Sequence, residues 1–290
     1  MKVDNAIIMA AGTSSRFAPL SYERHKGLTL VRGEVLIERQ IEQLIAAGVP
    51  QIYIVTGYKA EQFDYLPRKY GVQLIHNPSY LVRNNNGSIW AARDVLSNSY
   101  VCSSDNYFCE NPFESEVDSA YYAAEYATGP TAEWCMEEDE QGNICSVTVG
   151  GSDAWYMMGH TFWSSAFSRT FLAILEREYN LPETAGKLWE KIFMEHLDTL
   201  KMRIRRYAPN ALFEFDTLDE LRLFDESYIA DTRSALIKRA ASALGASEAD
   251  ISNITSLKSD NTEAAGFQFD CRGATYSFTY GTDELTQLKG

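Results

Sequence analysis

The sequence has few of the groups on which metal centres and disulfide frameworks depend. Its five cysteines are odd in number and include no C-x-x-C pair, so free thiols in a reducing compartment are the simplest interpretation. Its four histidines fall at no spacing typical of metal ligands. The sequence therefore predicts neither a zinc site nor a disulfide-stabilised fold.

Basic residues are also scarce. Lys and Arg total 26 against 40 Asp and Glu, which gives a formal charge of −14. Nucleic acid is disfavoured as the main partner, because phosphate backbones recruit basic surfaces. A nucleotide substrate is not excluded, since it needs only a locally positive pocket. The simplest interpretation of the acidity is a solubilising surface.

Long hydrophobic runs are missing as well. No segment approaches the ~20 apolar residues that span a bilayer, and the N-terminus enters an apolar run without a basic region or a cleavage site. We therefore expect a cytoplasmic protein without membrane insertion. With 45% hydrophobic residues in 290, the chain can bury one core and carry an appendage.

Strand-like and helix-like segments alternate along the first hundred residues. Strands are predicted over residues 5–10, 51–56, 72–76 and 100–103, and helices over 34–47, 61–70 and 88–96. This order is typical of an α/β, Rossmann-like sheet, mainly parallel and flanked by helices. Substrates are expected at the carboxyl ends of its strands.

The pattern changes after residue 105. Strands are predicted over 120–126, 133–137, 144–149, 202–207 and 212–215, and helices over 165–179 and 183–197. Antiparallel strands are thus inserted late into the sheet. We place a domain boundary near residue 225, so that residues 1–225 form the α/β domain. Residues 226–290 form a small α+β appendage, with one amphipathic helix from Ile229 to Leu244 and a hairpin around Arg272-Gly273.

The turn after the first strand, A-A-G-T-S-S-R-F at residues 10–17, is rich in small and hydroxyl residues. Such a turn lets backbone N–H groups approach an anion, with the Thr13 and Ser14 hydroxyls as further donors. Arg16 and Lys26 are the expected catalytic residues, placed to hold a triphosphate and the charge that develops during phosphoryl transfer. The turn matches neither G-x-x-x-x-G-K-[ST] nor G-x-G-x-x-G, which disfavours an ATPase loop and a dinucleotide fold. The alternative is a plain strand-to-helix turn.

Three acidic residues form a second group. Asp105 follows a predicted strand, while Glu214 and Asp216 are two apart on another, so that both project from one face. Mg²⁺ prefers a few carboxylates together with phosphate oxygens and water, which indicates a magnesium site. The alternative is that these are separate acids that cap loops.

Several segments occur in an order that resembles a known family. They are residues 10–17, Lys26, 36–39, 55–58, 84–89, Asp105 and 213–218. Together they resemble the bacterial CTP:phosphocholine cytidylyltransferases of the MobA-like nucleotidyltransferase superfamily, over roughly residues 5–225. The opening motif specifies only the superfamily, whose members also activate sugar phosphates. The ending E-F-D-T-L-D-E-L and Leu188-Trp189-Glu190 are more particular to the choline-type branch.

The resemblance implies a role for each group. The residues implied to bind the nucleotide are Ala10, Ala11, Gly12, Thr13, Ser14, Arg16, Lys26, Asn85, Ser88 and Asp105, with Ser88 near the cytosine. It further implies that Asp105, Glu214 and Asp216 serve Mg²⁺, and that a substrate phosphate attacks the α-phosphorus of CTP in line, releasing pyrophosphate. Many members of the superfamily carry a second glycine where this chain has Ser14.

The acceptor is expected to be phosphocholine. A quaternary ammonium donates no strong hydrogen bond, so proteins hold it against aromatic faces with carboxylates nearby. The candidates are Trp134, Tyr156, Trp189 and Glu190, although an aromatic residue is more often part of a core than of a cage. The alternatives are 2-aminoethylphosphonate, a sugar phosphate, or a catalytically idle module that only binds nucleotide.

The tail resembles the opening of choline/ethanolamine kinases. The segments concerned are residues 254–262, 267–269, 273–276 and 281–285. No catalytic loop of a kinase follows, so kinase activity is not expected from this chain. Either the chain is part of a larger fusion, or the tail is a remnant used for packing or for a homodimer.

Overall fold

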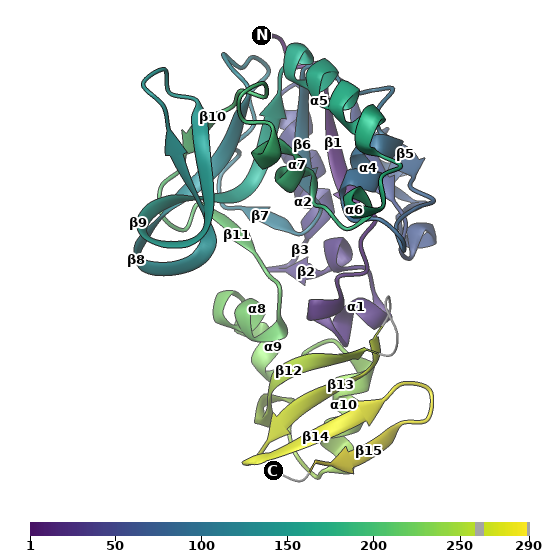
Figure 1. The fold of residues 1–290 in the computed structure, drawn as a ribbon. Helices are drawn as coiled ribbons and strands as arrows, with labels where there is room; N and C mark the ends of the chain where they lie inside the picture. The colour runs from purple at the N-terminus through teal and green to yellow at the C-terminus, as the bar shows by residue number, and fades with distance from the viewer. Residues whose placement is uncertain (259–263, 289–290) are drawn as a thin grey trace. The chain divides into compact units, whose positions relative to one another are not determined.

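The computed structural model describes residues 1–258 and 264–288, which form two compact units (Figure 1). The first unit comprises Met1–Gly12 and Leu36–Glu214, and the second comprises Thr13–Val35 and Phe215–Gly290. The predicted boundary near residue 225 therefore falls inside the second unit. Local sequence patterns do not reveal that residues 13–35 fold with the C-terminal part of the chain.

The first unit is built on a seven-stranded sheet in the order β10-β8-β9-β6-β1-β4-β5. The strands are β1 (Asn5–Ala10), β4 (Ile52–Thr56), β5 (Gln73–His76), β6 (Ser99–Ser103), β8 (Tyr121–Glu138), β9 (Ile144–Trp163) and β10 (Arg203–Arg206). β1 pairs in parallel with β4 and β6, and β9 runs antiparallel to β6 and β8. The predicted mixed, mainly parallel sheet is confirmed. β1 lies in its interior, which is why its sequence is apolar on both faces.

Helices cover both faces of this sheet. They are α2 (Leu36–Ala46), η3 (Ala60–Phe63), α3 (Leu66–Tyr70), α4 (Asn86–Ala91), α5 (Ser165–Glu178), α6 (Pro182–Ala185) and α7 (Trp189–Glu195). In Figure 1, α5 and α7 lie in front of the sheet and α2 behind it. α4, α5 and α7 share one core with β6, β8 and β9, which contains Ile89, Phe171 and Trp189. No helix in the described ranges is both long enough and apolar enough to cross a bilayer.

Several predicted elements of the first unit differ from the structure. The helix expected over 61–70 is broken into η3 and α3, because Pro67 favours the first turn of a new helix. The helix expected over 183–197 is also two helices, α6 and α7. The helix expected over 88–96 is α4, which ends at Ala91, and the helix expected from residue 34 begins at Leu36 as α2.

The three strands expected between residues 120 and 149 are parts of two long strands. Shifts in the β8–β9 register, one of them between Ala127 and Pro130, mark bulges. Bulges let paired strands continue through residues that otherwise indicate a turn. Gly129 and Pro130 in β8 and Gly150 and Gly151 in β9 are typical of turns, but here both strands continue through them.

The second unit combines short helices with an antiparallel sheet. Its helices are η1 (Ser15–Phe17), α1 (Leu20–Glu23), η2 (Lys26–Leu28), α8 (Leu218–Phe224), α9 (Ser227–Ala230), α10 (Ala235–Ala243) and η4 (Glu248–Asp250). β2 (Leu30–Val31) and β3 (Glu34–Val35) form a hairpin, and the four-stranded sheet contains β12 (Ile251–Lys258), β13 (Ala264–Cys271), β14 (Ala274–Thr279) and β15 (Glu284–Gln287). The predicted α+β character of the appendage agrees with this arrangement.

The hairpin around residues 272–273 is confirmed. Arg272 and Gly273 have φ values of 48° and 80°, and a two-residue turn between twisted strands requires positive φ at both positions. The single helix predicted from Ile229 to Leu244 is wrong: α9 ends at Ala230, and Ser234 caps a new helix by accepting the N–H of Ile237. Of the kinase-like segments, residues 259–262 lie outside the described residues.

Gly57 follows β4 and packs closely against the turn after β1. A Cβ atom at this position would lie 2.7 Å from Tyr80 Cβ and 2.8 Å from the Ala11 carbonyl oxygen. We expect Gly57→Ala to lower the free energy of unfolding by about 1–3 kcal/mol, measured by urea denaturation. Gly186→Ala is the matched control, since its Cβ would meet nothing within 4 Å. Equal stability of the two variants would contradict this close packing.

Candidate active site

The carboxyl ends of β1, β4 and β6 lie side by side in the first unit. The Ala11 carbonyl after β1 accepts the N–H of Tyr58 after β4 at 3.0 Å, and the Met9 carbonyl accepts the N–H of Ser104 after β6 at 3.1 Å. The structure therefore brings the predicted nucleotide turn, Ala10 to Gly12, to the same sheet edge as Asp105. This edge is where open α/β sheets bind their ligands.

Asp105 and Glu214 are brought together by a small antiparallel sheet in the same unit. β7 (Asn106–Phe108) pairs with β11 (Leu212–Glu214), so that Glu214 stands opposite Asn106. The Asn106 Nδ2 donates to Glu214 Oε2 at 3.3 Å. Asp105 directly precedes Asn106, the residue that stands opposite Glu214.

The predicted relation between Glu214 and Asp216 is wrong. β11 ends at Glu214, and Asp216 precedes Thr217, the N-cap of α8. The Glu220 carboxylate accepts the backbone N–H groups of Asp216 and Thr217, while the Thr217 hydroxyl accepts the N–H of Glu220. This reciprocal capping box has a T-x-x-E sequence signature at 217–220, which could have indicated a helix start instead of a continuing strand.

The second unit holds two cations on one carboxylate. The Arg16 guanidinium lies 2.6 Å from Asp216 Oδ2, and the Lys26 ammonium lies 3.2 Å from Asp216 Oδ1. The Lys26 side chain is only 4% exposed, whereas that of Arg16 is 74% exposed. Two positive groups thus converge on one carboxylate, an arrangement suited to holding a polyphosphate.

Ser14, the residue before η1, has a left-handed backbone conformation, with φ 49° and ψ 45°. This conformation is uncommon for residues other than glycine, asparagine and aspartate. The backbone at this position thus has the shape that a glycine adopts without strain. The Ser14 carbonyl accepts the N–H of Phe17 at 2.9 Å and closes η1, the turn that carries Arg16.

The predicted nucleotide residue Asn85 is bound to the start of α7. Its Oδ1 accepts the N–H of Trp189 at 2.6 Å, and its Nδ2 donates to Glu190 Oε2 at 3.0 Å. The neighbouring Asn86 Nδ2 donates to the Thr184 carbonyl at 2.9 Å. These amides hold the segment before α7, a positioning role that the sequence reading missed. A run of three asparagines was the available signal.

Ser88, expected near the cytosine, is buried in α4. Its hydroxyl accepts a hydrogen bond from Asn77 Nδ2 at 3.3 Å. Asn77 follows β5, so this bond connects α4 to the carboxyl edge of the parallel strands, where the nucleotide turn also lies.

The structure places Trp189 in the core. Its side chain is only 1% exposed, stacks on Tyr122 at 5.8 Å between centroids, and meets Trp163 edge to face at 5.0 Å. The ring therefore shows no open face for an ammonium, in contrast with the cage prediction. Trp134 and Tyr156 are half-buried on β8 and β9 and keep part of their surface accessible.

Glu190 lies beside Trp189 and is half-buried. Burial raises the pKa of its carboxyl to about 7, although hydrogen bonds from Asn85 and Tyr122 oppose that rise. Because the folded pKa lies above the unfolded value near 4.5, the folded state binds the extra proton between these two pH values. Stability from this group is therefore present at low pH and lost as pH rises toward 7.

We expect Glu190→Gln to remove this dependence. The variant should match the wild type near pH 5 and be more stable at pH 8 by up to about 2 kcal/mol, because it carries no buried charge. Urea unfolding at pH 5 and pH 8 measures the difference. If the difference in stability between Glu190→Gln and the wild type were the same at both pH values, Glu190 would not titrate with a raised pKa.

The fold and these groups define a class of protein. A model of the MobA-like NTP transferase domain matches residues 6–111, and the protein is a nucleotidyltransferase. The chain is 30% identical to choline-phosphate cytidylyltransferase from Streptococcus pneumoniae over 221 residues, which cover 76% of this chain and 96% of the relative. It belongs to the cytidylyltransferase family.

Two further comparisons agree. The chain is 34% identical to 2-aminoethylphosphonate cytidylyltransferase from Lancefieldella rimae over 234 residues, covering 79% of this chain and 95% of the relative. The structure of the S. pneumoniae CTP:phosphocholine cytidylyltransferase LicC matches with a TM-score of 0.74 at 30% identity, covering 78% of this chain and 99% of that one.

Proposed function

We propose that this protein is a cytoplasmic enzyme that transfers CMP from CTP to phosphocholine, giving CDP-choline and pyrophosphate. The observation that carries the proposal is the pair of cations, Arg16 and Lys26, assembled on Asp216. A guanidinium and an ammonium that converge on one carboxylate are suited to bind the oxygens of a triphosphate. The similarity to enzymes that use CTP supports the choice of nucleotide.

In the proposed reaction, backbone N–H groups of residues 10–14 bind the nucleotide. Asn85 and Ser88 position the segment that lies beside the cytosine. Arg16 and Lys26 hold the phosphates and stabilise the charge that develops as pyrophosphate leaves. The acceptor phosphate attacks the α-phosphorus in line, and orientation with charge neutralisation supplies the rate.

Oxygen ligands for Mg²⁺ are present in both units. Glu214 and Asp105 lie in the first, and Asp216 lies in the second. The described residues contain no group of three or more His, Cys, Asp or Glu side chains placed to hold a metal. A cation that enters with a nucleotide takes much of its coordination from phosphate and water, so one or two of these carboxylates fit it. Bound there, Mg²⁺ would neutralise phosphate charge.

For the acceptor, Trp134 and Tyr156 offer accessible aromatic surface and Glu190 a carboxylate. Aromatic faces suit the quaternary ammonium of phosphocholine. A primary amine would instead donate hydrogen bonds to Glu190. The second candidate acceptor is therefore 2-aminoethylphosphonate. The 34% identity to a 2-aminoethylphosphonate cytidylyltransferase supports this alternative.

The test is pyrophosphate release with CTP and Mg²⁺, comparing phosphocholine, phosphoethanolamine, 2-aminoethylphosphonate and glucose 1-phosphate. Turnover with phosphocholine, at a kcat/KM at least tenfold above the others, is the expected result. Preference for the phosphonate would overturn the acceptor and keep the nucleotide chemistry. Silence with all four would favour a module that only binds nucleotide.

A further inference from the structure

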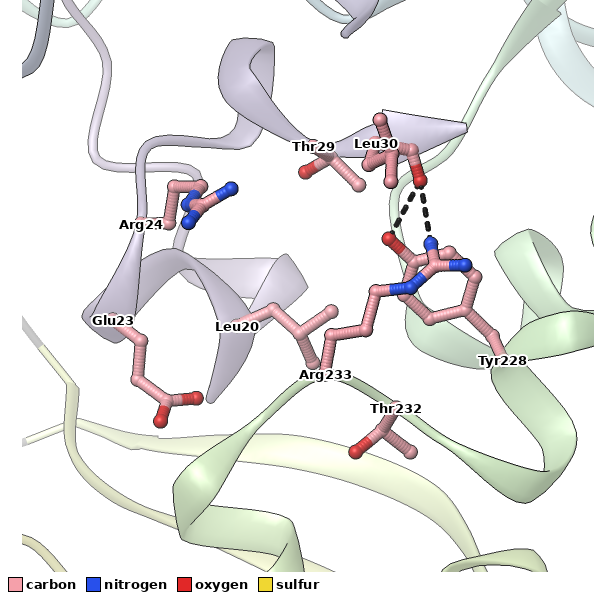
Figure 2. A pocket seen from close by; sticks show the side chains of 8 residues that line it. All are labelled: Leu20, Glu23, Arg24, Thr29, Leu30, Tyr228, Thr232 and Arg233. Atoms are coloured by element: carbon pink, nitrogen blue, oxygen red, sulfur yellow. Dashed lines mark hydrogen bonds between the residues drawn. The ribbon is translucent and has the colours of Figure 1, made fainter. Parts of the chain in front are cut away.

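A cavity of about 300 Å³ lies wholly within the second unit (Figure 2). One wall comes from Leu20, Glu23, Arg24, Thr29 and Leu30, and the other from Tyr228, Thr232 and Arg233. Its volume is at the lower end of the range for small-molecule sites. None of the residues assigned above to the nucleotide, the acceptor or Mg²⁺ lines it.

Arg233 is fixed at one side of this cavity. Its guanidinium donates to the Leu30 carbonyl and to Ser227 Oγ, both at 2.8 Å, and lies over the Tyr228 ring at 4.1 Å. These contacts are all to neutral groups. Asp225 and Asp231 lie near it without forming an ion pair: the pKa of Asp225 is lowered against the effect of burial mainly by hydrogen bonds from Ser227 and Arg32, and that of Asp231 mainly by Lys238, with the Arg233 charge a smaller cause in both. Arg233 is thus an oriented cation whose guanidinium forms no ion pair with a carboxylate of the described residues.

Arg24 supplies a second cation. Figure 2 shows Arg24 and Arg233 on different sides of the cavity, with Thr29 along the edge between them. No hydrogen bond or ion pair of the Arg24 guanidinium occurs within residues 1–258 and 264–288. Thr29 is buried, which fixes its position at the cavity.

The acidic residue of the lining does not offset both cations. Glu23 Oε1 accepts the backbone N–H groups of Ala235 at 2.7 Å and Leu236 at 3.3 Å, at the start of α10. The lining holds two guanidinium groups and one carboxylate, while the Glu248 carboxylate accepts the N–H and the hydroxyl of Thr232. Leu20 and Leu30 add an apolar wall.

We propose that this cavity binds a small phosphate or phosphonate, separately from the CTP assigned to Arg16 and Lys26. A guanidinium donates two parallel hydrogen bonds to an oxyanion, and the Thr29 hydroxyl can donate a third. The apolar wall suits a short carbon chain, so the ligand class includes organic monoesters as well as inorganic phosphate. A bound ligand joins the segment that carries Lys26 to the segment 228–233.

Isothermal titration calorimetry on the full chain tests this site, in a sulfate-free chloride buffer without nucleotide. The probes are inorganic phosphate, phosphocholine and 2-aminoethylphosphonate. All titrations use an Arg16→Met background, which weakens anion binding at the proposed active site. We expect one binding event to remain, and Arg24→Met to weaken it at least tenfold. Arg239→Met is the matched control and should change it less than twofold, since Arg239 is exposed and pairs with Asp283.

Thr29→Val provides a second variant that keeps the cavity's shape and removes one donor, with an expected loss of three- to tenfold. Tighter binding of an organic probe than of inorganic phosphate would assign an ester as the ligand, and equal binding would assign phosphate itself. Absence of binding up to 10 mM, or binding that Arg24→Met leaves unchanged, would overturn the proposal. Pyrophosphate release by the Arg24→Met single variant is expected to persist, which separates this test from that of the proposed function.

Discussion

Replacing Lys26 by methionine is expected to lower kcat/KM for CTP-dependent pyrophosphate release by about 10²–10³-fold, the usual cost of losing one preorganised donor to a developing charge. Methionine has a similar length and no charge, so the substitution removes the ammonium while leaving most of the packing. The Lys26 side chain is almost fully buried beside Asp216, so water cannot replace it easily. Steady-state kinetics with CTP and the preferred acceptor measures the effect.

Lys238→Met is the control for this experiment. Lys238 is half exposed and forms a surface ion pair with Asp231 at 2.7 Å, in the same unit of the protein. Exposed pairs contribute about 0–1 kcal/mol, so its activity should stay within twofold of the wild type. A folded Lys26→Met variant with near-normal kinetics, folding being checked by circular dichroism, would remove Lys26 from the proposed phosphate site.

The second large effect concerns stability. Trp189→Ala is expected to lower the free energy of unfolding by about 3–5 kcal/mol, because truncating a buried tryptophan loses its transfer free energy and leaves a cavity. The ring contacts Tyr122, Trp163 and Phe171 in the core shared by α5 and α7. Urea denaturation followed by circular dichroism measures the loss.

Trp134→Ala serves as the comparison, because Trp134 is half-buried and packs at the border of the same core. Its loss of stability should be clearly smaller, and its KM for phosphocholine should rise if it contacts the ammonium. A stable Trp189→Ala variant with a strongly raised KM for phosphocholine would reverse this assignment and return Trp189 to the acceptor site.

Local patterns predicted the parts of the fold that local physics determines. The apolar runs of β1, β4 and β6 are buried on both faces, and their composition alone indicates interior strands. The helix over 165–179 was also found nearly complete as α5, since Ser164 caps it through the N–H of Phe167. These signals all lie within a few residues of the element that they describe.

Features set by distant residues could not be predicted in this way. The start of α7 is held by Asn85, 104 residues earlier in the chain, and the burial of Trp189 depends on strands and helices elsewhere. The cluster of Arg16, Lys26 and Asp216 was anticipated only in part. The sequence predicts that the two cations act together. It places Asp216 on a strand at a magnesium site, and it does not indicate the ion pairs that Asp216 forms with Arg16 and Lys26.

The two-segment origin of the second unit has a consequence for biosynthesis. Lys26 and Asp216 are 190 residues apart, and Glu23 meets the N–H of Ala235 across 212 residues. At roughly 5–20 residues per second, about 10–40 s separate the translation of the lysine from that of its aspartate. The segment 13–35 therefore emerges long before the residues that fold with it. The cation cluster is completed only near the end of translation, and a nascent chain interrupted before residue 216 cannot form it.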